Sequence, residues 1–224
     1  LLEEQKQAVI HRAVTRGLDP NVRLKPSGIE WLGDVPEHWA IRKLGRIARI
    51  FNGTTPSRMQ PGYWSGGTHP WLASGKVNDY IVQTPSELIT DRALRECSLP
   101  LVPRNSVIIG LVGQGRTRGM CALAAIDAYI NQNLAAIVPK HILNGHFLLH
   151  LLTAHYRAIR EIGRGGNQEA LNCEIIANLR LPIPPLAEQS MIDAELAGRI
   201  RDVGSARASA LPGRWRTPSE RRSR

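Results

Sequence analysis

The stretch "LRLPIPPLAEQ", Leu179–Gln189, decides how this chain is organised. Its three prolines stand within four positions, and residues that favour helices follow them directly. Proline fixes φ and suits the approach and first turn of a helix, but it breaks a helix interior. Glu188 would lie near the positive N-terminal end of such a helix. The stretch therefore predicts a strand that ends at the prolines and a helix that starts near Leu186.

The first residues predict a matching helix. In Leu1–Arg16 apolar residues recur at helical spacing with charged residues on the other side, and Gly17 is placed to stop the helix. Residues 18–38 are rich in Pro and Gly and lack periodicity, which favours an extended linker. We expect a helix at 1–17, a linker at 18–38, a globular domain at 39–183 and a second helix at 184–203.

The two ends of the chain carry further expectations. No Met opens the sequence, so we expect it to begin within a longer protein. Gly204, Pro212 and Gly213 should break the second helix. Residues 204–224 are therefore expected to form a basic, disordered tail.

The body alternates between short apolar runs and loops. Runs bounded by Gly, Pro or Asn predict strands at 69–74, 79–83, 106–113, 129–139 and 179–184. Apolar residues at helical spacing predict helices at 85–98 and 145–163. The predicted fold class is α/β (α+β), with one globular mixed-sheet domain flanked by helices.

The amino-acid composition limits the kinds of binding partner and the cellular compartment that we expect. The 224 residues carry a formal net charge of +10, which makes a polyanion the first partner to consider. No run of about 18 apolar residues exists to cross a membrane. Three distant cysteines, Cys97, Cys121 and Cys173, fit a reducing compartment, so we expect a cytoplasmic protein.

The sequence contains no recognisable catalytic constellation. Gly113, Gly115 and Gly119 are spaced GxGxxxG, one residue too long for a dinucleotide fingerprint, so a turn with an exposed pair of arginines is favoured. His146 and His150 stand at i, i+4, but no HExxH motif accompanies them, which favours a helix with incidental histidines over a zinc site. We expect no catalytic residue, no metal and no cofactor on this chain.

Four loops instead combine Gly with side chains that contact nucleic acid. Arg suits guanine edges, Asn and Gln suit adenine edges, and glycines let backbone amides approach phosphates. The loops are "FNGTTPSRMQPGYWSGGTH", "SGKVNDY", "GQGRTRG" and "GRGGNQEALN". The candidate DNA-binding residues are Thr54, Thr55, Ser57, Arg58, Lys76, Asn78, Gln114, Arg116, Arg118, Arg164, Asn167 and Gln168.

The whole pattern resembles the DNA-specificity subunit of type I restriction-modification systems. The resemblance rests on segments that run in family order over about residues 1–198. They are "LLEEQKQAVIHRAVTRGLDPNV", "SGIEWLGDVPEHW", "NGTTPSR", "PWLASGKVND", "GQGRTRGM", "YINQNLAAIVP", "GGNQEALN" and "LPIPPLAEQ". Each segment alone is weak, but their combination in this order is specific.

The resemblance implies a non-catalytic target-recognition domain that reads one part of a split double-stranded DNA site, between the end of one spacer helix and the start of another. Modification (methyltransferase) subunits would transfer methyl from S-adenosylmethionine to adenine. A restriction (motor-nuclease) subunit would use ATP and magnesium. The family does not fix its base-contacting residues by motif. A single recognition domain could be a fragment, or a half-subunit that self-associates.

Other functions stay open from the sequence. The PxxP of Pro182 to Pro185 could dock an aromatic groove, which would make the chain a protein-interaction adaptor. The interrupted second helix allows a truncated, non-functional specificity subunit. An independent nuclease or methyltransferase is disfavoured, because no phosphate loop or methylation motif is present.

Overall fold

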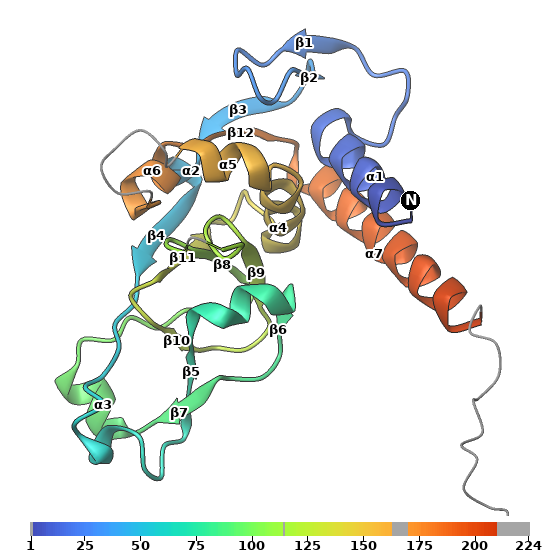
Figure 1. The fold of residues 1–224 in the computed structure, drawn as a ribbon. Helices are drawn as coiled ribbons and strands as arrows, with labels where there is room; N and C mark the ends of the chain where they lie inside the picture. Colours follow the sequence, from blue (N-terminus) through green and yellow to red (C-terminus); the bar gives the residue numbers. More distant parts are fainter. Residues whose placement is uncertain (1, 114, 163–169, 210–224) are drawn as a thin grey trace, which may run out of the picture.

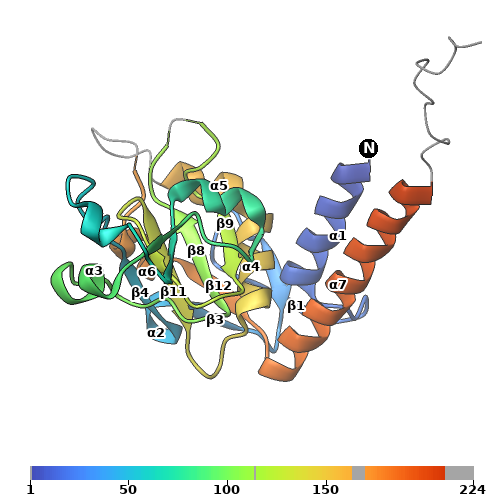
Figure 2. The same ribbon diagram turned by 90° about the horizontal axis from the view of Figure 1, so that it is seen from below.

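The computed structural model describes residues 2–113, 115–162 and 170–209. A sheet-containing body lies between two terminal helices, α1 (Leu2–Arg16) and α7 (Leu186–Ser209), which run side by side (Figures 1 and 2). No helix in the described ranges is long and apolar enough to cross a membrane.

A five-stranded sheet forms the centre of the body. Its order is β4 (Ala48–Asn52), β11 (Leu134–Pro139), β8 (Ser106–Gly110), β9 (Cys121–Ala124) and β6 (Ile81–Val82). Neighbouring strands are antiparallel except β6 and β9, which are parallel. The sheet is therefore mixed, as predicted.

Both faces of this sheet are covered, which explains why its strands read as continuous apolar runs. Along β8, Val107 and Ile109 belong to one hydrophobic cluster and Ile108 to another. Successive side chains of a strand point to opposite faces, so the two clusters are the two sides of the sheet. The first cluster packs against α1, α7 and α4 (Gly145–Ala154).

A smaller three-stranded sheet lies at the opposite end of the body from α1 (Figure 1). Its order is β10 (Tyr129–Ile130), β5 (His69–Leu72) and β7 (Glu87–Ile89), with the turn η1 (Pro61–Tyr63) and the helix α3 (Asp91–Glu96) beside it. The helix predicted at 85–98 is thus wrong in its first half. Ile89 is buried opposite His69 in the ladder, and Thr90 caps the shorter helix by accepting from the Ala93 amide.

Other predicted elements are shortened or divided. The strand expected at 79–83 shrinks to β6 after the 3₁₀ helix η2 (Ser74–Asp79), and 129–139 divides into β10 and β11 around a turn. The helix expected at 145–163 divides into α4 and α5 (Tyr156–Ile162). His155 separates them, and its ring Nδ1 lies 3.1 Å from the Leu151 carbonyl oxygen.

The prolines of the opening stretch lie where the sequence places them. Pro182 lies within β12 (Arg180–Ile183), and Pro184 and Pro185 follow its end. This strand pairs with β3 (Ala40–Lys43), which leads into the short helix α2 (Leu44–Ile47), and α6 (Cys173–Asn178) precedes β12. The linker 18–38, by contrast, is not merely extended. It contains a small antiparallel pair, β1 (Leu24–Pro26) and β2 (Asp34–Pro36).

The terminal helices share the core of the body. Val14 of α1, the fully buried Trp39, and Ile192 of α7 belong to the same cluster as the sheet residues. The backbone of α7 continues through Gly204 to Ser209, so the break expected at Gly204 is wrong. A glycine within a helix costs about 1 kcal/mol, which weakens a helix without forbidding it. The tail expected beyond it, 210–224, lies outside the described residues.

Candidate nucleic-acid interface

Eight of the twelve candidate residues lie in the described chain. They occupy the loop after β4 (Thr54, Thr55, Ser57, Arg58), the helix η2 (Lys76, Asn78) and the loop between β8 and β9 (Arg116, Arg118). The other four lie outside the described residues, and they are Gln114, Arg164, Asn167 and Gln168.

The loop after β4 leaves the sheet at a point of close backbone contact. A Cβ on Gly53 would meet the Ile130 carbonyl oxygen at 1.8 Å, so only glycine fits there. The Thr54 amide donates to the same carbonyl at 2.9 Å. The Thr55 hydroxyl donates to Gln132 Oε1 at 2.5 Å, so that hydroxyl is already engaged.

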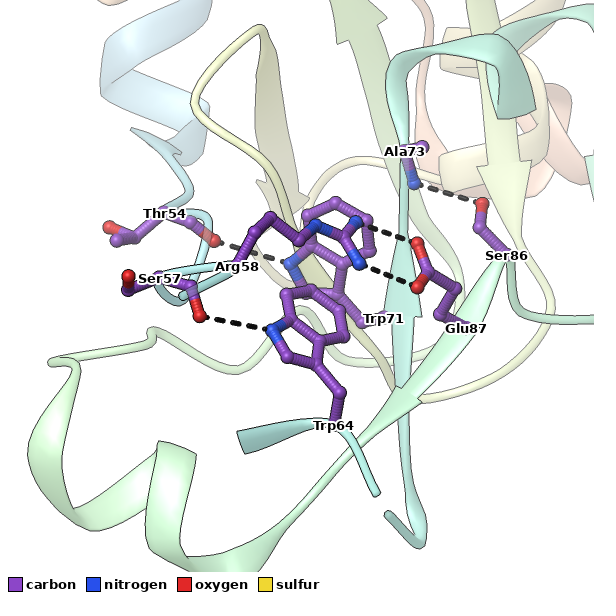
Figure 3. Close-up of polar contacts among 8 residues, drawn as sticks. All are labelled: Thr54, Ser57, Arg58, Trp64, Trp71, Ala73, Ser86 and Glu87. Atoms are coloured by element: carbon purple, nitrogen blue, oxygen red, sulfur yellow. Dashed lines mark hydrogen bonds and ion pairs between the residues drawn. The ribbon is translucent and has the colours of Figure 1, made fainter. Parts of the chain in front are cut away.

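Arg58 closes the loop in a stacked ion pair (Figure 3). Its two terminal nitrogens donate to the two carboxylate oxygens of Glu87 at 2.6 and 2.7 Å. Its guanidinium lies 3.6 Å from the centroid of the Trp64 ring and 5.4 Å from that of Trp71. The hydrogen bonds raise the pKa of Arg58 and lower the pKa of Glu87. Glu87 thus uses the donor pair that a guanine edge would need.

The same two tryptophans hold the loop's backbone. The Trp71 indole donates to the Thr54 carbonyl and the Trp64 indole to the Ser57 carbonyl, each at 3.2 Å (Figure 3). Both the Thr54 and the Ser57 side chains are exposed. The loop therefore presents these two hydroxyl groups outward on a backbone fixed from beneath.

The two candidate residues on η2 differ in how far their side chains are exposed and already hydrogen-bonded. The Lys76 ammonium donates to Asp79 Oδ2 at 2.8 Å and to the Thr84 hydroxyl at 3.3 Å, and its side chain is 18% exposed. Asn78 is exposed and donates only within its own turn, to the Gly75 carbonyl at 2.7 Å. Asn78 is the better placed of the two to contact a ligand.

The loop between β8 and β9 separates its two arginines. Arg116 is exposed, but Arg118 is only 1% exposed, so the expected exposed pair is wrong. Gly113 and Gly119 have φ of +131° and +82°, which turns the chain so that Arg118 points inward. Arg118 therefore cannot contact DNA without a rearrangement of the loop, whereas Arg116 can.

Helix α5 supports this loop from the side. The Tyr156 hydroxyl donates to the Arg116 carbonyl at 2.7 Å, and an Arg160 terminal nitrogen donates to the Arg118 carbonyl at 3.1 Å. Backbone carbonyls held in this way fix where the side chains between them project. The position of Arg116 thus depends on α5.

A cavity of about 890 Å³ joins two of the predicted loops. Asn78 and Arg116 both line it, together with Arg157 of α5 and His11 of α1. Arg157 is exposed and was not among the predicted residues, since it belongs to a stretch that the sequence marks only by its apolar face. The loop after β4 does not line this cavity. It lies at the end of the body that carries α3 and β7 (Figure 1).

Aromatic rings form one wall of the cavity. The rings of His11 and His155 stack with centroids 5.1 Å apart, and Trp31 meets His155 edge-on at 4.8 Å. Burial, together with the nearby His11, lowers the pKa of His155 to about 4. His155 is therefore neutral near pH 7.

The histidines of α4 join the body to α7 rather than forming a metal cluster. The Tyr80 hydroxyl lies 2.7 Å from His150 Nδ1, and His150 Nε2 lies 3.2 Å from Asp193 Oδ1. His146 Nδ1 lies 3.7 Å from the same carboxylate oxygen. Among the described residues, no group of three or more potential metal ligands is present.

Comparison with known proteins assigns the chain to a family. The family model of the type I restriction modification DNA specificity domain matches residues 36–196, so the chain belongs to this family.

Two curated relatives agree with the assignment. The chain is 22% identical over 197 residues to the specificity subunit of the type I restriction enzyme EcoR124I/EcoR124II of Escherichia coli, covering 87% of this chain and 46% of that subunit. It is 26% identical over 171 residues to the MjaIX specificity subunit of Methanocaldococcus jannaschii, covering 74% of this chain and 39% of that subunit. The chain spans less than half the length of these relatives.

Solved structures show the same fold. The HsdS subunit from Thermoanaerobacter tengcongensis matches 94% of this chain over 46% of its own, with a TM-score of 0.66 and 20% identity. A chain from a study of assembly and conformational transition in the type I restriction-modification system matches 93% of this chain over 46% of its own, with a TM-score of 0.67 and 21% identity.

Proposed function

We propose that this chain is a target-recognition domain of a type I specificity subunit and reads one part of a split double-stranded DNA site. The family match over residues 36–196 carries the proposal. The cavity that brings Asn78 and Arg116 together supports it, because an amide and a guanidinium are the side chains that read adenine and guanine edges. The domain itself is non-catalytic and directs adenine methylation and restriction by its partners.

The loops contribute in different ways. Arg116 and Asn78 are the base-reading candidates, and the hydroxyls of Thr54 and Ser57 serve as phosphate or sugar contacts. Arg58 and Arg118 position the loops from within. Lys76 is paired with Asp79 and holds the turn that carries Asn78.

The partners follow from the same assignment. Modification subunits would dock on the antiparallel pair of α1 and α7, and the restriction subunit would join through the complex. S-adenosylmethionine, ATP and magnesium would be bound by those subunits. If the chain acts as a half-subunit, two copies paired through α1 and α7 would supply two half-sites. This function belongs in the cytoplasm.

The adaptor alternative is not favoured. Pro182 lies within β12 opposite Ile41, and Pro184 is buried. A proline-rich ligand needs an accessible extended segment, and this one is built into the junction between strand and helix.

Selection from a randomised duplex library by the chain together with its partner methyltransferase tests the function. The proposal predicts enrichment of one short motif, with binding that weakens steeply as salt increases. Retention of the library without any enriched motif would reduce the chain to a non-specific DNA-binding protein and overturn the proposal.

A further inference from the structure

A second basic surface lies away from the loops that form the proposed recognition site. Its five exposed cations, called here the basic strip, are Lys43, Arg46, Arg49, Lys140 and Arg180. In Figure 2, α2 and β3 lie at the bottom of the view, whereas the chain between β8 and β9 rises at the top. A duplex bound by the recognition loops would therefore leave this side uncovered.

Two of the cations face each other across a ladder. Lys43 of β3 is directly opposite Arg180 of β12. Directly opposite residues project on the same face of the pair, and like charges placed there are destabilising. Lys43 reaches only a neutral group, donating to Asn178 Oδ1 at 3.1 Å. No acidic side chain of the described residues therefore offsets the repulsion between Lys43 and Arg180.

The other three cations continue the same surface. The Lys140 ammonium donates to the Arg46 backbone carbonyl at 3.0 Å, which places the Lys140 side chain beside α2. Arg49 is opposite Val138 in the ladder between β4 and β11, and Lys140 follows Val138 by two residues. The Lys140 amide donates to the Ile47 carbonyl at 2.9 Å, so Arg49 and Lys140 both lie at this end of the ladder.

The cations of the strip have no carboxylate on their own strands or helix, and in the described chain Glu174 of the adjacent α6 forms no ion pair with them. No Asp or Glu occurs within β3, α2, β4 or β12. Within the ranges that the structure describes, no ion pair involves any of the five cations. Five exposed cations without a carboxylate partner form a surface that attracts an anionic polymer.

The geometry points to the sugar-phosphate backbone of double-stranded DNA as the occupant of the basic strip. A protein partner would need an apolar centre to its interface, and none of the exposed large hydrophobic side chains of the described chain lies on these four elements. Phosphates need only exposed cations. The strip thus contacts DNA independently of sequence, either beyond the recognised site or on a second duplex segment, which goes beyond the proposed function.

Charge reversal on the strip tests this inference. The variant carries Arg46→Glu and Arg180→Glu, and the second change sets a carboxylate opposite Lys43, so the ladder should tolerate it. A matched control, Arg23→Glu with Arg104→Glu, changes the net charge equally at exposed positions outside the strip. A milder variant, Arg49→Gln with Lys140→Gln, serves if the first fails to fold. Binding to a random-sequence duplex is measured across salt concentrations.

We expect the slope of log affinity against log salt to lose about 0.9 for each phosphate contact removed, about 2 units in all, with at least tenfold weaker binding at low salt. The control variant should change both the salt slope and the affinity at low salt by less. The strip variant should still select the same motif as the unmodified chain. Equal slopes for strip variant and control would overturn the inference, as would unchanged DNA binding with loss of the partner methyltransferase. Failure of the proposed function is distinguishable, because the unmodified chain would then select no motif.

Discussion

At the scale of single residues, Arg58 shows how a side chain that the sequence predicts to bind DNA can stabilise the fold instead. Its guanidinium joins Glu87 to the Trp64 ring, and each partner comes from a different segment of the chain. A Gly-rich loop without such a contact would sample many conformations. Arg58 therefore adds a side-chain contact to the backbone bonds with which Trp64 and Trp71 hold the loop after β4.

We therefore predict that Arg58→Ala destabilises the protein by about 1 kcal/mol, the sum expected from a half-exposed ion pair and a cation–π contact. Tryptophan fluorescence should change as well, because the Trp64 ring loses its cover. Arg95→Ala, at an exposed position on α3, is the control. Wild-type stability together with wild-type fluorescence would show that Arg58 does not organise the loop.

His155 gives a prediction about pH. Its folded-state pKa is lowered to about 4 from an ordinary 6.5, so between these values the unfolded chain binds a proton that the folded chain does not. Stability must then fall as pH decreases from about 6.5 to 4, by up to roughly 3 kcal/mol. His155→Phe keeps a ring in the stack and should flatten this part of the profile in urea unfolding, whereas replacing the exposed His141 should not. If His155→Phe left the dependence of stability on pH unchanged, His155 would not be the group that causes the fall.

At the scale of elements, the junction between β12 and α7 is rigid because the first turn of α7 is bonded to the body. Glu188 accepts from the buried Trp39 indole at 3.0 Å and lies 2.8 Å from His38. Gln189 is fully buried, donates to the Ile142 and Pro184 carbonyls, and accepts from the Asn144 amide. The helix therefore leaves the body in a fixed direction.

Removing Gln189 should loosen that junction. Gln189→Ala leaves one buried amide and two carbonyls without their partner, so we predict a loss of about 3 kcal/mol in the free energy of unfolding. Chemical denaturation measures it, with Ser190→Ala at the exposed neighbouring position as control. A loss below about 0.5 kcal/mol would mean that water replaces the three hydrogen bonds and that the junction is not fixed by this residue.

Elements with a local cause could be predicted from the sequence. The helix α1, the strand β12 and the start of α7 follow from spacing and from proline chemistry. The strand β7 could not, since Glu87–Ile89 pairs with β5, eighteen residues earlier in the chain, and such pairing leaves no local pattern. The same holds for the break at His155, where the bond to Leu151 ends one helix and α5 begins in another direction.

The candidate site, too, could be predicted only in part from the sequence. Asn78 and Arg116 could be proposed because exposed polar residues near glycines are visible in a sequence. That Arg118 is buried beside them depends on a tertiary turn, and that Arg157 joins their cavity depends on how α5 packs. Chemical type could be predicted from sequence, whereas exposure and neighbours required the fold.

At the scale of the whole molecule, the paired helices α1 and α7 project beside the body, whereas the proposed recognition loops and the basic strip belong to the body itself (Figure 2). Under the two proposals above, the recognition loops would supply sequence preference and the basic strip would supply affinity that salt removes. Rigid attachment of α7 fixes how far and at what angle a second recognition domain would stand. If two recognition domains are joined as proposed, the spacing between their half-sites would be set by these helices rather than by the loops.

We propose that Arg116, whose backbone carbonyl is held by Tyr156 of α5, reads a base. The most direct measurement is duplex selection performed in parallel with the unmodified chain and with Arg116→Ala. We expect the unmodified chain to enrich one motif. The variant should lose preference at one position of that motif, at a cost of about 1 to 3 kcal/mol, and keep the others. An identical motif selected with identical affinity would contradict it.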